Sequence, residues 1–416
     1  MATKYKRIQA RIERNKEHRK EIKKKILDKY DNYDSIFTFQ NYVSALRKCN
    51  KGVRYKLSTQ EFNMNAIEKI HEIISTIESG TIPSPKRIVK IIINERGKER
   101  NITPIVYYDR ITQRVLCDNA LVPSIGHSLI YDNGASMKDK GVDFARKRML
   151  RHLQKAIKMY GSNFYVLQFD FKSFFDSIEH STCYDVLNVT FDDNRIVSEN
   201  MEIIKSYPIV EAKQNMKDSD ELSAYINDIQ NNKGVGICLG SQVSQIMALG
   251  VPSKIDHHIK DKCSIHGYER YMDDGVVLHN NKVYLQELLS EIIELAECLG
   301  LKLNLKKTKI VKATKGFTFL KVKYFVTHDG KIIRKLSHDG IVRMRRKLKK
   351  FKRLVDNSEM SLDDVYASMQ SWLEHSRIAK SYKTRKRMLK LYDELFGGYK
   401  MTRNFRHRQM QLCTAT

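Results

Sequence analysis

Hydrophobic positions along this chain follow a helical spacing in some stretches and a strand-like spacing in others. Isoleucines three and four residues apart predict a helix over about 59–79, because this spacing places them on one face. Two β-branched runs, 88–93 and 101–107, flank a polar turn and predict a hairpin with basic residues at its tip. Further elements are predicted in this order: a helix over 141–159, a strand over 164–169, a helix over 241–259, two short strands within 267–279, an amphipathic helix over 284–299, and strands over 308–313 and 317–326.

Both ends of the chain are basic and have a helical pattern. Residues 1–27 carry eleven Lys or Arg and three Glu, which is typical of a solvated helix or of a helix lying against a polyanion. Near the other end, eight of the eleven residues 343–353 are Lys or Arg around an apolar stripe. Ser361 and Asp364 form a capping-box pattern, which predicts the start of a further helix.

Composition narrows the classes of partner. The 416 residues include 75 Lys and Arg against 48 Asp and Glu, a net charge of +27, which favours a polyanionic partner such as a nucleic acid. No apolar run is long enough to span a membrane, and the first residues lack the apolar region of a signal peptide. The seven cysteines are scattered without a CxxC pair, so we expect free thiols in a reducing cytoplasm rather than a zinc site or disulfides.

Acidic residues end two of the predicted strands. Asp170 follows the apolar run FYVLQF, and Asp273-Asp274 lies inside RYMDDGVV. Adjacent carboxylates repel each other unless a cation offsets them. Three carboxylates at neighbouring strand ends form an oxygen-rich site suited to Mg²⁺, and two such ions can activate a hydroxyl and hold a leaving pyrophosphate. On its own, an Asp-Asp turn is more often a solvated hairpin, so the surrounding residues decide between the two interpretations.

The surrounding motifs resemble those of reverse transcriptases. The segment 165–180, YVLQFDFKSFFDSIEH, is similar to their first catalytic motif, and Tyr271-Met272-Asp273-Asp274 is similar to their YxDD motif. Further blocks resemble family motifs in the family's order: 100–116 and 140–150 the fingers blocks, 236–245 the template- and nucleotide-contacting motif, and 304–310 with 317–325 the motifs that close the palm.

This resemblance implies a mixed α/β (α+β) right-hand polymerase with fingers, a palm of antiparallel sheet plus helices, and a helical thumb. We expect a basic helical N-terminal extension over 1–85, fingers and palm forming the catalytic domain over 86–335, and a basic helical thumb with a C-terminal tail over 336–416. The implied reaction is RNA-directed DNA synthesis, in which deoxynucleotides are added to a primer 3′-end by two-metal catalysis.

The resemblance also implies roles for individual residues. Asp170, Asp273 and Asp274 would bind two Mg²⁺ ions, or Mn²⁺ in their place, with the backbone carbonyl of Phe171 completing the shell. Phe175 falls on the steric-gate position, where a bulky ring collides with a ribose 2′-hydroxyl. The implied catalytic proton donor to pyrophosphate is Lys307, with Lys306 adjacent. The implied nucleotide contacts are Lys98, Arg100, Leu239 and Gly240. The implied primer or template contacts are Ser244, Gln245, Tyr271, Met272, Phe319 and Leu320.

Three positions depart from the usual family pattern. Leu239 stands where many relatives have glutamine, Gln245 where many have proline, and Lys321 where the primer grip often has glycine. The first two resemble a bacterial branch that includes diversity-generating retroelement enzymes, and the C-terminal region lacks the residue patterns of an endonuclease or a ribonuclease H. We therefore expect a stand-alone bacterial, cytoplasmic enzyme of a phage-defence or retroelement system.

The expected partners are an RNA template, deoxynucleoside triphosphates and the DNA product. A dedicated structured non-coding RNA is one candidate template, and an accessory protein or an oligomer is compatible with the sequence, whereas a membrane is not expected. Three alternatives stay open: a diversity-generating retroelement enzyme, a template-independent or protein-primed DNA polymerase, and a non-catalytic RNA-binding protein. The intact Asp170, Asp273 and Asp274 argue against the last of these.

Overall fold

The first part of the chain is helical. The computed structural model describes residues 14, 17–18, 21–22, 24–81, 85, 87–95, 98–402 and 405–407, so much of the helix expected over 1–27 lies outside the described residues. A short helix η1 (Tyr33–Ser35) precedes α2 (Phe39–Cys49), α3 (Leu57–Met64) and α4 (Ala66–Glu78). The helix predicted over 59–79 is therefore two helices, because Asn65 between them leaves the helical backbone region with φ −123° and ψ 40°.

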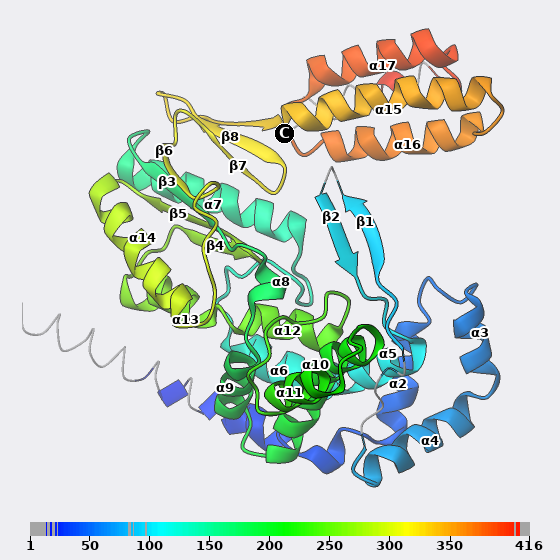
Figure 1. The fold of residues 1–416 in the computed structure, drawn as a ribbon. Coiled ribbons are helices and arrows are strands. Elements are labelled where there is room, and N and C mark those ends of the chain that lie inside the picture. The colour runs from blue at the N-terminus through cyan, green and yellow to red at the C-terminus, as the bar shows by residue number, and fades with distance from the viewer. Residues whose placement is uncertain are drawn as a thin grey trace, which may run out of the picture.

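An antiparallel hairpin comes next, as the sequence predicts. β1 (Ile91–Glu95) pairs with β2 (Lys98–Ile102). Both strands extend into the polar segment expected as the turn, and the second ends before residue 107, where α5 (Tyr107–Leu116) begins. A π-helical turn η2 (Cys117–Leu121) joins α5 to α6 (Val122–Ser128). In Figure 1 strands β1 and β2 project from these helices.

A four-stranded antiparallel sheet occupies the centre of the chain. Its strands are β3 (Tyr165–Asp170), β4 (Tyr268–Tyr271), β5 (Asp274–His279) and β6 (Lys309–Lys312), in the order β4-β5-β3-β6. Successive side chains of a strand face opposite sides of the sheet. Val166 accordingly packs in the cluster with α7 (Val142–Tyr160), and its neighbour Leu167 packs in the cluster with α14 (Lys282–Glu297). The two helices predicted at 141–159 and 284–299 are confirmed, and each covers one face of the sheet.

Helices fill the chain between β3 and β4. They are α8 (Phe174–Ser177), α9 (His180–Thr190), α10 (Asn194–Asn215), α11 (Ser219–Gln230), α12 (Gln242–Gly250), α13 (Ser253–His257) and the π-helical turn η3 (His258–Lys262). The helix predicted over 241–259 is interrupted between α12 and α13 at Pro252, because proline has no N–H to donate to the helix and its ring clashes with the preceding turn.

A second sheet and three helices complete the described chain. The sheet contains β7 (Phe317–Phe319), β8 (Val322–Val326) and β9 (Ile332–Leu336), so the strand predicted over 317–326 is a hairpin. The helices α15 (His338–Asp356), α16 (Leu362–Ser376) and α17 (Tyr382–Phe396) bury their apolar stripes in a cluster of their own. The N–H of Asp364 donates to Ser361 Oγ over 3.2 Å, as the capping box predicts. In Figure 1 this helical unit lies at the opposite end of the molecule from α9–α12.

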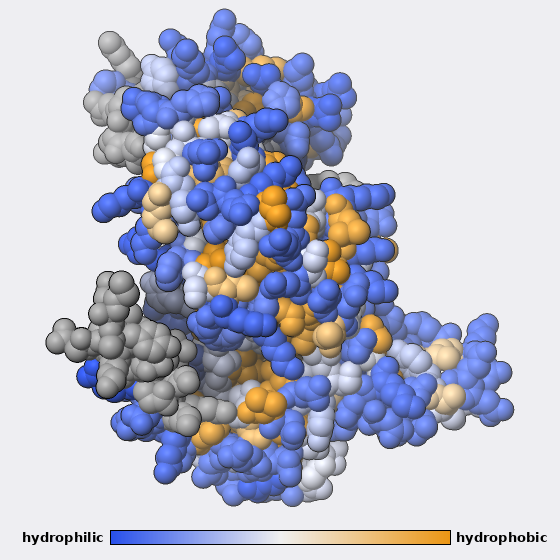
Figure 2. All heavy atoms as spheres, turned by 90° about the vertical axis from the view of Figure 1, so that its left-hand side faces the viewer, coloured by the Kyte–Doolittle hydropathy of each residue, from blue (hydrophilic) through white to orange (hydrophobic). Residues whose placement is uncertain are grey.

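The face of the molecule drawn in Figure 2 is largely hydrophilic. The face drawn in Figure 2 shows separate groups of hydrophobic residues among hydrophilic ones. Among the helices that the structure describes, none combines the length and the apolar character that crossing a membrane requires. The structure confirms the expected mixture of helices with antiparallel sheets.

Candidate active site

The register of the central sheet brings two of the predicted aspartates side by side. β3 and β5 run antiparallel, and Asp170 at the end of β3 pairs with Asp274 at the start of β5. Directly opposed residues in such a pair have Cβ atoms about 4.5–5.5 Å apart. Asp170 is 5% exposed, so the site begins with a carboxylate that is almost wholly withdrawn from solvent.

The tight turn between β4 and β5 adds the third aspartate. Met272 has φ +54°, a left-handed conformation that is uncommon for residues other than glycine. The N–H of Phe171 donates to the carbonyl of Asp273 over 3.3 Å, which ties this turn to the end of β3. The structure therefore brings Asp170, Asp273 and Asp274 together at one end of two neighbouring strands.

Gly275 is required for the close packing behind the turn. A Cβ atom at this position would lie 2.1 Å from Cζ of Phe169, the residue opposite Gly275 in the register. The Phe169 ring in turn stacks on Tyr268, with ring centroids 6.4 Å apart. A side chain in place of this glycine would push β5 away from β3 and separate the aspartates.

Burial and repulsion by neighbouring carboxylates dominate the electrostatics of Asp274. The pKa of Asp274 rises to about 7, with burial as the largest cause, followed by the charges of Asp273 and Asp170 and a hydrogen bond with Asp170. Lys307 acts in the opposite sense, and its Nζ lies 2.6 Å from Asp170 Oδ2. One ammonium does not neutralise three carboxylates, so the cluster fits additional cations. Ligands that are all oxygen suit Mg²⁺.

A cavity of about 300 Å³ opens beside the aspartates. Asp170 and Asp274 line it together with Lys306 and Lys307, so both lysines named from the sequence reach the cavity. A small space lined by both carboxylates and lysines suits an anion that is bound together with a cation, such as a phosphate.

A buried ion pair behind the turn was not predicted from the sequence. The side chains of Arg270 and Asp256 are both 0% exposed, with Nη2 2.7 Å from Oδ2 and Nε 2.8 Å from Oδ1. The same guanidinium donates to the carbonyl oxygens of Met272 over 3.0 Å and Leu249 over 2.9 Å. Arg270 thus holds the left-handed residue of the β4–β5 turn against α12 and α13. An arginine directly before the Tyr-Met-Asp-Asp segment is the sequence signal that could have indicated this contact.

The aromatic run after Asp170 lies partly in the core. Phe171 is 2% exposed and stacks on Phe174 with ring centroids 5.3 Å apart. Phe175 is half-buried, with its ring edge-on to Phe174 at 5.7 Å. The N–H of Ile237 donates to the Phe175 carbonyl over 2.9 Å, so the segment that precedes α12 fixes this residue.

The predicted nucleotide-contacting loop docks on the chain that follows the hairpin. The carbonyl of Leu239 accepts the N–H of Thr103 over 3.1 Å. Gly240 has φ +137°, and a Cβ atom there would lie 2.3 Å from the Thr103 carbonyl oxygen, a close approach that requires glycine. Ser244 is 1% exposed, whereas Gln245 Nε2 donates to a serine hydroxyl over 2.9 Å at the surface.

The remaining predicted contacts are distributed over three elements. Lys98 and Arg100 lie on β2, and their side chains are outside the described part of the chain. Tyr271 ends β4 and is half-buried. Phe319 is 2% exposed, and the carbonyl of Leu320 accepts a hydrogen bond from an arginine of α7 over 2.8 Å.

Comparison with known proteins gives one family match. A family model described as "Reverse transcriptase (RNA-dependent DNA polymerase)" matches residues 85–324. A search of curated proteins found no match.

Several solved structures that resemble this one are telomerases. Apo telomerase from Candida tropicalis truncated from its C-terminal domain is 13% identical with a TM-score of 0.42, and the alignment covers 64% of this chain and 59% of that one. Apo telomerase from the same organism is 13% identical with a TM-score of 0.41, over 83% of this chain and 66% of that one. Telomerase from Candida albicans in complex with a TWJ fragment of telomeric RNA is 14% identical with a TM-score of 0.37, over 83% and 63%. This chain thus spans less than two thirds of the length of these telomerase chains.

Proposed function

This chain belongs to the reverse transcriptase family, and we propose on that premise that it is an RNA-directed DNA polymerase, adding deoxynucleotides to a primer 3′-end on an RNA template. The match over 85–324 includes all three aspartates of the candidate site. The observation that carries the proposal is the convergence of Asp170, Asp273 and Asp274 at one end of an antiparallel sheet, with lysines lining the adjacent cavity.

The aspartates would hold the divalent cations that this reaction needs. Asp170, Asp273 and Asp274 supply carboxylate oxygens, and the backbone carbonyl of Phe171 is the fourth proposed ligand. Two Mg²⁺ ions, or Mn²⁺ in their place, supply activation of the primer hydroxyl and stabilise the charge of the leaving pyrophosphate when bound. The raised pKa of Asp274 supports this role, because a cation would relieve the repulsion that contributes to the shift.

Lys307 is the proposed proton donor to the leaving pyrophosphate. Its ammonium lies 2.6 Å from Asp170, and its side chain is 48% exposed toward the cavity side of the site. The Lys307 ammonium contacts Asp170, which is also a proposed metal ligand. It would therefore lie near a phosphate oxygen bound in the same cavity and could donate a proton to it. Lys306 lines the same cavity, so comparison of the two single variants identifies the donor.

The nucleotide is proposed to contact the loop and helix next to the aspartates. The half-buried ring of Phe175 would exclude a ribose 2′-hydroxyl and so favour deoxynucleotides. Leu239 and Gly240 would contact the base or template, and leucine can only pack there because it has no hydrogen-bonding group. Lys98 and Arg100 on the hairpin are the proposed triphosphate ligands.

We propose the boundaries 1–85, 86–335 and 336–416 for the N-terminal extension, the fingers and palm, and the thumb. The separate apolar cluster of α15–α17 supports the last boundary. The exposed cations of α15 would contact the phosphate backbone of the bound duplex; they are Arg343, Arg345, Arg346, Lys347, Lys349, Lys350 and Arg353.

The proposed template is a dedicated structured RNA, bound by an enzyme of a bacterial defence or retroelement system. The net charge of +27 supports a large polyanionic partner. Sequencing the RNA that copurifies with the full chain, and any DNA made from it, identifies the template. A variable set of mutated DNA copies would instead favour a diversity-generating enzyme.

Primer extension by the purified full chain tests the proposed activity. With Mg²⁺, a DNA primer and an RNA template, we expect template-dependent incorporation of deoxynucleotides. Phe175→Val should raise ribonucleotide incorporation relative to deoxynucleotide, whereas Phe39→Val, on a half-exposed position of α2, should not. Incorporation without any template would favour the template-independent alternative. RNA binding without any synthesis would refute the polymerase proposal.

A further inference from the structure

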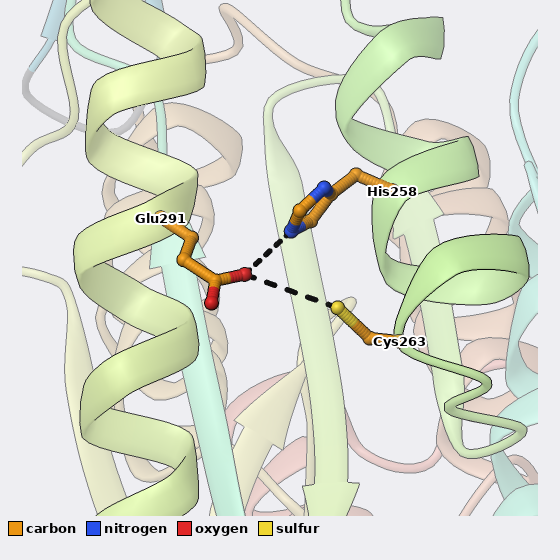
Figure 3. Close-up of side chains that lie close together, drawn as sticks. All are labelled: His258, Cys263 and Glu291. Atoms are coloured by element: carbon orange, nitrogen blue, oxygen red, sulfur yellow. Dashed lines mark hydrogen bonds and ion pairs between the residues drawn. The ribbon is translucent and has the colours of Figure 1, made fainter.

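A second cluster of metal-ligating side chains lies outside the candidate active site. His258 begins η3, Cys263 directly follows it, and Glu291 belongs to α14. Figure 3 shows the three side chains pointing toward one another across the space between these two segments. His258 Nε2 lies 2.6 Å and Cys263 Sγ 3.9 Å from the same Glu291 oxygen, Oε2.

The π-helical turn brings the histidine and the cysteine to the same side. The N–H of Cys263 donates to the carbonyl of His258, five residues earlier, over 2.9 Å. In a regular α-helix, residues five apart point about 140° away from each other. A π turn closes after five residues, so His258 and Cys263 can both face Glu291. Such turns are rare and occur frequently at functional sites.

The three ligand types select the class of cation. Thiolate, imidazole and carboxylate are the ligands of Zn²⁺ in proteins, whereas Mg²⁺ and Ca²⁺ take oxygen ligands. We propose that His258 Nε2, Cys263 Sγ and Glu291 Oε2 bind one Zn²⁺ ion, with the fourth tetrahedral position open to water.

The observed spacing is close to what tetrahedral coordination needs. At normal zinc–ligand bond lengths, nitrogen and oxygen ligands lie about 3.3 Å apart, and sulfur and oxygen ligands about 3.6 Å apart. The corresponding distances here are 2.6 Å and 3.9 Å, so the ion requires ligand movements below about 1 Å. The Glu291 side chain is 51% exposed and His258 only 11% exposed, so the glutamate is the ligand that can adjust.

Zinc binding displaces one proton. The Cys263 thiol releases its proton to solvent, and the imidazole binds through Nε2 as the neutral tautomer that carries its proton on Nδ1. Burial raises the pKa of the Cys263 thiol; Tyr284, Glu291 and Lys262 also act on it. Zinc therefore competes with a proton for the thiolate, and the apparent affinity increases with pH.

The position of the cluster suggests what the ion does for the protein. Cys263 belongs to the segment that leads into β4, and Glu291 belongs to the helix that follows β5. A bound ion would link the two ends of the hairpin whose turn carries Asp273 and Asp274. This role stabilises the hairpin and is separate from nucleotide addition.

Titration of the metal-free full chain with Co²⁺ tests the site. Excess Mg²⁺ is added to occupy the carboxylates of the candidate active site. Those ligands include no thiolate, so cobalt bound there would not give a thiolate-to-cobalt band. We expect a thiolate-to-cobalt charge-transfer band in the near ultraviolet that saturates at one equivalent and disappears when Zn²⁺ is added. Cys263→Ser should abolish the band, and His258→Ala and Glu291→Gln should weaken cobalt binding at least about tenfold. Cys298→Ser, which removes an exposed thiol just after α14, should leave the band unchanged.

Two results would refute the proposed zinc site. One is the absence of the band in the folded wild-type chain, and the other is its loss in Cys298→Ser but not in Cys263→Ser. Circular dichroism checks the fold of each variant. Glu291→Gln changes a half-exposed side chain, so it keeps the test decisive even where Cys263→Ser fails to fold. Zn²⁺ should also raise the Tm of the wild-type chain and of Cys298→Ser, but not that of Cys263→Ser.

Discussion

Replacing Asp256 with asparagine should destabilise the protein far more than an ordinary surface change. The substitution keeps the shape of the side chain but removes the charge that pairs with Arg270. Both side chains are 0% exposed, and two guanidinium nitrogens lie within 3.0 Å of the carboxylate. Removing one partner of a buried pair leaves an uncompensated charge, which costs about 3–5 kcal/mol. We expect the free energy of unfolding to fall by that amount.

The same substitution should impair nucleotide addition in the protein that remains folded. Arg270 donates to the carbonyl of Met272, which has a left-handed φ of +54°. This backbone conformation costs about 1–3 kcal/mol and persists only where the surrounding structure holds it. When the guanidinium shifts, the turn relaxes and Asp273 moves with it. A displacement of about 1 Å at reacting groups can lower the rate roughly 100-fold.

Urea denaturation and primer extension at a temperature well below unfolding measure the two effects. The matched control is Asp34→Asn, which breaks an arginine pair of 2.8 Å whose side chains are 54% and 77% exposed. Exposed pairs contribute about 0.2–1 kcal/mol. The reasoning is refuted if Asp256→Asn costs no more than Asp34→Asn, or if folded Asp256→Asn extends primers at the wild-type rate.

Three further predictions follow from the site and the surface. The pKa of Asp274 is about 7 in the folded chain, so the affinity for Mn²⁺ measured by calorimetry should rise from pH 6 to pH 8. Without metal, the free energy of unfolding should fall as pH rises from about 4 to 7, because the folded state keeps this proton to a higher pH than the unfolded state. Gly275→Ala should lower the free energy of unfolding by about 1–3 kcal/mol or more, because the new Cβ would lie 2.1 Å from a buried ring. The control Gly126→Ala should cost less in the same denaturation assay, because its Cβ meets only the flexible end of a methionine, at 2.3 Å. Replacing Lys349 and Lys350 with glutamine should reduce the slope of log affinity for RNA against log salt by up to about 2, and an unchanged slope would show that α15 does not contact phosphates.

The proximity of the three aspartates could be predicted because their signals are local. A strand that ends on an aspartate and a hairpin that carries two more are visible in short segments, and the register then places Asp170 opposite Asp274. The fold class, a mixed α/β polymerase of the reverse transcriptase family, is likewise confirmed, because several motifs occur in order over residues that the family match covers. The roles assigned to Phe175, Lys307 and the other contacting residues stay predictions.

Features that depend on distant contacts were missed. Arg270 and Asp256 are fourteen residues apart on different elements. The arginine before the Tyr-Met-Asp-Asp segment is a local signal, but nothing in the local pattern identifies Asp256 as its partner. The hairpin within 317–326 was interpreted as one strand, because its turn residues Leu320 and Lys321 adopt φ of +46° and +69° without the glycine or asparagine that usually marks such a turn.

The cysteines likewise show that local sequence patterns do not reveal contacts between distant residues. The six cysteines in the described part of the chain are free thiols. Cys263 nevertheless meets a histidine and a glutamate through a π turn and a separate helix. Spacing along the sequence does not reveal this arrangement.

Primer extension by the double variant Asp273→Asn with Asp274→Asn tests the central claim most directly. Asparagine keeps the size of each side chain and removes the charges that would hold the cations, so DNA synthesis on an RNA template should be abolished while RNA affinity changes by no more than a few-fold. Asp220→Asn with Glu221→Gln makes the same change of charge on the exposed first turn of α11 and should leave synthesis intact. Substantial DNA synthesis by a folded Asp273→Asn, Asp274→Asn protein would contradict the assignment of these carboxylates to catalysis.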